Sequence, residues 1–153
     1  MASAVGRGIA ALGLALALAA GASPARADEA AGAAELVKLE VTVLQVSDQP
    51  GEADPRCERF DRLLRGQIPY QSLSIADTHE REVPVNEVWT LPLPNSRSLL
   101  IRPLEADAGK GSLLSLDVEE SVQGDFRVRR GQPLVVGGPR FGDGRLVVVV
   151  DME

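Results

Sequence analysis

Apolar and polar residues alternate along much of the chain after residue 35. The clearest alternation runs from Leu36 to Val43, where apolar side chains take every second position and Lys38, Glu40 and Thr42 lie between them. A period of two is expected of a strand with one buried face. This segment is the best strand prediction in the first half of the chain.

Short apolar or alternating segments separated by Gly and Pro continue to the end of the sequence. Pro94, Asn95 and Ser96 predict a tight turn between two of them. The further predicted strands are residues 70–76, 83–91, 98–104, 114–118, 126–128, 134–136 and 146–150. Seven or eight such strands predict a mainly β fold, an antiparallel β-sandwich or small barrel. The uninterrupted apolar run from Leu146 to Val150 indicates a central strand covered on both faces.

One short helix is predicted near residues 55–65. Asp54 is a good N-cap and Pro55 suits the first helical position, where its missing N–H costs nothing. Cys57, Phe60 and Leu64 follow at helical spacing, and Gly66 is placed to end the helix. This helix therefore has one apolar side, which we expect to be buried.

The first 27 residues have the order of a cleavable signal peptide. A positive charge at Arg7 precedes an apolar stretch from Ile9 to Ala20, and Ala25-Arg26-Ala27 is a suitable cleavage site. The apolar stretch is too short to span a bilayer, which needs about 20 residues. We expect residues 28–35 to be a flexible leader and residues 36–153 a single β-sandwich domain, exported and periplasmic or extracellular, with no membrane insertion after cleavage.

Charge and cysteine content narrow the function classes. Loss of Arg7 and Arg26 leaves 14 basic against 22 acidic residues, a net charge of −8. Nucleic acid is therefore a poor candidate partner, because backbone binding needs clustered Lys and Arg. With one cysteine the chain has no internal disulfide. Its stability must come from packing.

The sequence offers few catalytic or metal-binding side chains. His79 is the only histidine and Cys57 the only cysteine, so a zinc site made of these residue types has at most two ligands. His79 lies in a polar stretch, residues 77–82, that reads as an exposed loop or strand start, which favours a solvated side chain over a catalytic one. Cys57 reads as a small buried hydrophobe, with a reactive or intermolecular thiol as the alternative. We expect no cofactor.

Carboxylates are numerous, but no pair is singled out. The candidates for glycosidase-type groups are Glu119 with Glu120, Glu80 with Glu82, and Asp107, but a charged solvated face explains them more economically. A calcium loop is not expected, because the D-x-D-x-D-G pattern is absent.

The glycine-rich segment from residue 131 to residue 146 is the most distinctive part of the sequence. It lacks the Lys-Ser/Thr of a phosphate-binding loop, and it leads into a strand rather than a helix. A hairpin is therefore favoured over a ligand loop, with Gly142, Asp143 and Gly144 forming its turn. If this loop has a partner, Arg140, Phe141 and Asp143 are its candidate interaction residues, with Arg140 and Phe141 as exposed anchors at the tip.

The second half of the sequence resembles small exported bacterial β-rich proteins of uncharacterised function. The residues that carry this resemblance are the Leu-Pro-Leu-Pro-Asn of 91–95, the Leu-Leu-Ile-Arg-Pro of 99–103, and the Gly-Gln and Val-Val-Gly-Gly-Pro of 131–139. The last of these is also similar, over fewer than ten residues, to the Gly-Gly hairpin near the C-terminus of bacterial secretins. Neither resemblance supplies a catalytic residue.

Three functions remain open from the sequence. The first is a non-enzymatic binding or accessory module of the cell envelope or of an extracellular or secretion assembly. The second is a carboxylate-based hydrolase acting on envelope glycan, which needs a cleft with two carboxylates about 5 to 9.5 Å apart. The third is a small-ligand carrier, which needs an apolar internal cavity of several hundred Å³.

Overall fold

The computed structural model of the protein describes residues 35–52 and 54–153. The expected signal peptide, residues 1–27, and the expected leader up to residue 34 lie outside the described residues.

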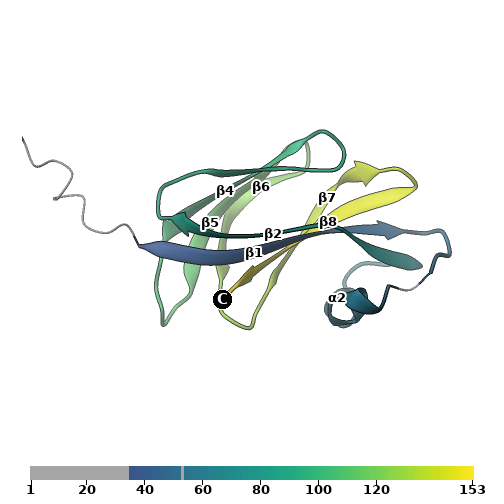
Figure 1. The fold of residues 1–153 in the computed structure, drawn as a ribbon, viewed down its shortest axis with the longest axis horizontal. Coiled ribbons are helices and arrows are strands. Elements are labelled where there is room, and N and C mark those ends of the chain that lie inside the picture. The colour runs from purple at the N-terminus through teal and green to yellow at the C-terminus, as the bar shows by residue number, and fades with distance from the viewer. Residues whose placement is uncertain (1–34, 53) are drawn as a thin grey trace, which may run out of the picture. The chain divides into compact units, whose positions relative to one another are not determined.

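Two four-stranded antiparallel sheets make up the described domain (Figure 1). Sheet A has the order β2 (Ser72–Pro84), β1 (Leu36–Ser47), β8 (Gly144–Met152), β7 (Leu134–Phe141). Sheet B has the order β3 (Trp89–Pro92), β4 (Ser98–Glu105), β5 (Ser112–Val118), β6 (Val122–Val128). The prediction of a mainly β fold is confirmed, and of its two forms the sandwich is observed rather than a closed barrel.

The main core lies between the two sheets. Alternate residues of each strand point inward. Leu39 and Val41 of β1 join Leu99 and Ile101 of β4 in one cluster, and these four side chains have no exposed surface. This arrangement follows directly from the period-two alternation in the sequence, because successive strand side chains point to opposite faces. Burial of apolar surface, which stabilises the fold by about 25 cal/mol per Å², is the main force that holds the sheets together.

The predicted helix is confirmed and forms a third layer on the outer face of sheet A. It consists of a 3₁₀ turn, η1 (Pro55–Cys57), followed by α2 (Glu58–Leu64). The Asp54 carboxylate accepts a hydrogen bond from the Arg56 N–H, and Gly66 follows the helix with a φ of 94°. A second buried cluster fills the space between helix and sheet, with members Leu44, Val46, Cys57, Phe60, Leu64, Leu73, Val147 and Val149.

Strand β8 is covered on both faces, as its sequence predicted. Leu146, Val148 and Val150 point into the core between the sheets, whereas Val147 and Val149 pack beneath the helix. The strand lies between β1 and β7 and is bonded to both. Five consecutive apolar residues are required here because both faces of the strand are excluded from water.

Several predicted strand boundaries were wrong. Residues 77–82, expected to be a loop or strand start, lie in the interior of the edge strand β2. Their side chains are exposed on both faces except for the half-buried His79, while their backbone pairs with β1. Residues 83–91 are not one strand, because a turn with φ of 70° at Asn86 separates β2 from β3. Strand β7 does not end at residue 136 as predicted but continues past Pro139 to Phe141, since its pairing with β8 is irregular after Gly137 and resumes at Arg140.

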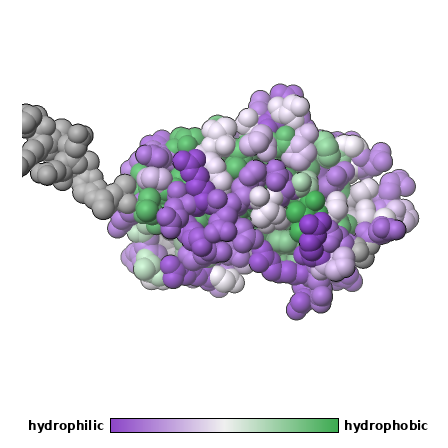
Figure 2. All heavy atoms as spheres, viewed as in Figure 1, coloured by the Kyte–Doolittle hydropathy of each residue, from purple (hydrophilic) through white to green (hydrophobic). Residues whose placement is uncertain are grey.

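The sheet edges carry proline or charge. Pro84 and Pro92 end the edge strands β2 and β3, and Pro139 lies at the irregularity of β7. Proline cannot donate to a ladder, so these residues limit pairing with another chain. The face of the molecule shown in Figure 2 is largely hydrophilic, and the large apolar residues described as exposed are Leu36, Val88 and Leu100.

Candidate functional site

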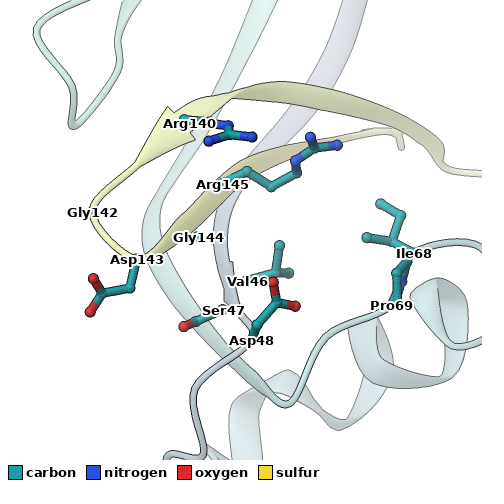
Figure 3. A pocket seen from close by; sticks show the side chains of 10 residues that line it. All are labelled: Val46, Ser47, Asp48, Ile68, Pro69, Arg140, Gly142, Asp143, Gly144 and Arg145. Atoms are coloured by element: carbon teal, nitrogen blue, oxygen red, sulfur yellow. The ribbon is translucent and has the colours of Figure 1, made fainter.

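A hollow of about 390 Å³ lies at the end of sheet A where the β7–β8 hairpin turns (Figure 3). We call it the hairpin cleft; it is lined by residues 46–48, 68–69, 140 and 142–145. Three separate segments meet there: the end of β1, the loop after α2, and the hairpin itself. The cleft therefore depends on contacts between residues about 100 positions apart in the sequence.

The hairpin is held tightly by its glycines. Gly142 and Asp143 form a two-residue turn, and Gly142 has a φ of 56°, which L-residues with side chains rarely adopt. Gly144 lies so close to β1 that a Cβ atom would overlap the Val46 carbonyl oxygen and lie 2.9 Å from Ser47 Cα. The turn is thus fixed both by its own backbone and by the neighbouring strand.

Two arginines are placed side by side by this turn. Arg140 of β7 is the direct partner of Arg145 of β8, and both side chains are on the helix-bearing face of sheet A and exposed. Figure 3 shows both guanidinium groups extending over the cleft. Within residues 35–52 and 54–153 neither arginine has an ion-pair partner. The cleft therefore has one wall with two positive charges that form no ion pair with a described carboxylate.

Of the three predicted interaction residues, the structure brings Arg140 and Asp143 to the cleft but not Phe141. Phe141 was expected to be exposed at the tip, but it is half-buried and packs against the core between the sheets. The error has a simple cause, since adjacent residues of a strand point to opposite faces and Arg140 takes the outer one. The Asp143 carboxylate is exposed at the tip of the turn and points away from the cleft (Figure 3).

The opposite wall contributes a carboxylate and an apolar surface. Figure 3 shows the Asp48 carboxylate entering the cleft, with Ile68 and Pro69 on a separate segment at the right of the view. The Gln71 N–H donates to the Ser47 carbonyl at 2.8 Å, which ties the loop after the helix to the end of β1. Sequence reasoning missed this wall. On the hairpin side, the pairing of Arg140 with Arg145 could have been predicted, because the two residues lie at equal distances from a two-residue turn.

The loop after the helix is also anchored through Tyr70. Its hydroxyl donates to Asp61 Oδ1 at 2.5 Å, and Arg65 Nη2 donates to Asp61 Oδ2 at 2.6 Å. The hydrogen bonds from Tyr70 and Arg65 lower the pKa of Asp61. Burial, followed by the bond to Asp61, raises the pKa of Tyr70 to about 12. The apolar wall of the cleft is therefore positioned by the helix.

His79 and Cys57 lie away from the cleft. His79 is half-buried in the middle of β2, not in a loop, and its Nε2 lies 2.9 Å from Asp77 Oδ2. Cys57 is buried beneath the helix, as expected, and this burial raises the pKa of its thiol. A thiol with a raised pKa is mostly protonated and reacts slowly.

Four of the five carboxylates named from the sequence, all but Glu82, have local partners. Glu119 and Glu120 both pair with Arg97, at 3.4 and 2.8 Å. Glu80 pairs with Lys38 at 2.9 Å. Asp107 accepts hydrogen bonds from the backbone N–H groups of Lys110 and Gly109, which lower its pKa. These side chains brace turns and strand ends, and none of them lines the hairpin cleft.

The described residues show neither a metal-binding cluster nor a membrane-spanning helix. In the part of the chain that the structure describes, no three His, Cys, Asp or Glu side chains are grouped so that they could hold a metal ion. No helix in that part is both long and apolar enough to cross a bilayer. Comparison of the chain with protein-family models, with curated proteins and with solved structures finds no match.

Proposed function

We propose that this protein is an exported, non-enzymatic binding module of the cell envelope or of an extracellular assembly, and that the hairpin cleft is its contact surface. The observation that carries the proposal is the pair of exposed arginines, Arg140 and Arg145, held side by side without a counter-ion in the described residues. Like charges directly opposite each other in a sheet are destabilising. An external anionic partner would relieve that cost.

The export half of the proposal rests on the signal-peptide pattern of residues 1–27 and on the resemblance to small exported bacterial β-rich proteins. An accessory role in a secretion assembly agrees with the local similarity to the secretin Gly-Gly hairpin, because residues 137 and 138 lie in β7, next to the cleft.

The other two functions have less support. A hydrolase needs two carboxylates that face each other across a cleft, whereas Asp48 enters the hairpin cleft and Asp143 points away from it. A carrier needs an apolar internal cavity, whereas the space between the sheets is filled by buried Leu, Val and Ile side chains and the hairpin cleft has charged walls. A binding role makes use of the hairpin cleft and of its two exposed arginines, Arg140 and Arg145.

Site-specific photo-crosslinking in intact cells tests this function. A photoreactive amino acid replaces Asp143 at the hairpin tip, and in a second strain it replaces Leu100, an exposed residue on sheet B. We expect one defined adduct from position 143 and none from position 100. Fractionation of the same cells reports whether the protein leaves the cytoplasm. An equal pattern of adducts from the two positions, or a protein that stays in the cytoplasm, would contradict the proposal.

A further inference from the structure

The chemistry of the hairpin cleft defines the kind of group that it can bind. Each guanidinium is a planar fork that forms paired hydrogen bonds with a carboxylate or a phosphate. Arg140 and Arg145 present two such forks from adjacent strands, and their Cβ atoms are expected to lie about 5 Å apart because they are direct cross-strand partners. Two forks at this spacing can hold one oxyanion between them.

The rest of the cleft separates the possible oxyanions. Asp48 places a negative charge in the same hollow, so that Arg140, Arg145 and Asp48 together carry one net positive charge, which a singly charged carboxylate neutralises and a doubly charged phosphate exceeds. None of the described residues that line the cleft is aromatic, so these residues offer no stacking surface of the kind that sugars commonly use. Ile68 and Pro69 instead offer an aliphatic surface next to the charges.

The cleft is also rigid enough to be selective. Arg145 lies on β8, whose next five residues are buried, and Gly144 is pressed against β1. Arginines that project from fixed strands lose less freedom on binding than arginines in a loop would. The hairpin therefore fixes the backbone from which the two arginines project before a ligand arrives.

On the basis of the binding function above, we propose that the hairpin cleft holds an acidic side chain of a partner protein, with an adjacent aliphatic side chain of that partner on Ile68 and Pro69. The carboxylate lies between Arg140 and Arg145, and an N–H of the partner backbone is available to the Asp48 carboxylate. The ligand class is thus an acidic, partly aliphatic peptide segment rather than a sugar or a phosphate.

Fluorescence anisotropy with labelled peptides tests this ligand class. The protein is recovered from cells that express the full chain, and the probe is a short peptide with one glutamate between two leucines and an amidated end. The matched peptide has glutamine in place of glutamate. We expect the glutamate peptide to bind at least about tenfold more tightly, because it alone forms charge-assisted hydrogen bonds. We also expect its affinity to fall as salt is added.

A pair of double variants shows whether the cleft is responsible. Arg140→Gln with Arg145→Gln removes both forks, and we expect about a tenfold or greater loss of affinity for the glutamate peptide. Arg81→Gln with Arg102→Gln is the matched control, since both residues are exposed and the change in charge is the same. Equal affinity for the two peptides, equal loss in both double variants, or displacement of the peptide by millimolar inorganic phosphate or polygalacturonate would overturn the proposal.

The two proposals fail in different ways. If the photo-crosslink from position 143 is retained in the Arg140→Gln, Arg145→Gln protein, the cleft is a contact surface but the acidic ligand class is wrong. If the peptides bind as expected but no adduct forms in cells, the ligand class is right and the proposed cellular role is wrong.

Discussion

Replacing Gly144 by alanine should separate β1 from β8 and destabilise the whole domain. The added Cβ would lie 2.8 Å from the Val46 carbonyl carbon and 2.9 Å from Ser47 Cα, with still less room at the carbonyl oxygen. These are backbone atoms of a central strand and cannot turn aside as a side chain can. We expect a loss of about 3 kcal/mol, the upper end of the cost of inserting one extra methyl group into a packed site.

Gly137→Ala is the matched control on the same hairpin. A Cβ at this position would meet nothing within 4 Å, and its φ is not in the left-handed region. Because alanine restricts the unfolded chain more than glycine does, we expect Gly137→Ala to be neutral or more stable by about 0.5 kcal/mol. The two substitutions are chemically identical, so their difference isolates the close approach of β8 to β1.

Urea unfolding followed by the fluorescence of Trp89, the only tryptophan and a buried one, measures both changes. With a slope of about 2 kcal/mol per molar urea, a loss of about 3 kcal/mol lowers the unfolding midpoint by about 1.5 M. If the midpoint of Gly144→Ala lies within about 0.3 M of the wild-type value, the contact between Gly144 and β1 is not as close as described and the argument for a fixed hairpin fails.

Three further outcomes follow from the layer beneath the helix. Tyr70→Phe should lower the free energy of unfolding by about 1 kcal/mol. The pKa of Tyr70 is about 12 in the folded protein against 10.0 for the free side chain, so the stabilisation from Tyr70 is complete below pH 10 and is lost as the pH rises toward 12. The Tyr70→Phe variant should lack this pH dependence. Because Tyr70 is the only tyrosine, its tyrosinate absorbance reports this titration directly, and a midpoint near 10 would contradict the bond to Asp61. Phe60→Ala should destabilise by about 3 to 4 kcal/mol in the same urea assay, against less than about 0.5 kcal/mol for the exposed Leu100→Ala. Cys57 should react with a thiol reagent at the rate of global unfolding, and rapid labelling of the native protein would show that the helix opens locally.

Much of the fold was predictable because it depends on local patterns. The alternation in β1 fixes which residues face the core, and the run from Leu146 to Val150 can be satisfied only by burial on two faces. The Asp54 cap and Gly66 mark the ends of the helix through their own backbone requirements. Each of these signals lies within about ten residues of sequence.

The candidate site was predictable only in part, because it is assembled from distant segments. The sequence pointed to Arg140 and Asp143, yet it could not show that Asp48 and Ile68 lie across the cleft from them. It misplaced Phe141 because the strand continues through Pro139, which sets the face of every residue up to the turn. His79 was misplaced for a related reason, since a polar segment on a sheet edge has the composition of a loop.

The position of β8 in the middle of sheet A has a consequence for how the protein is made. Residues 144–152 are the last of the domain to leave the ribosome, and until they do so β1 and β7 have no strand between them. Sheet A cannot be completed before these residues are made, so the domain stays open until its last strand has been synthesised. For a protein that is exported as we propose, late closure would leave time for a translocation machinery to engage the chain before it folds.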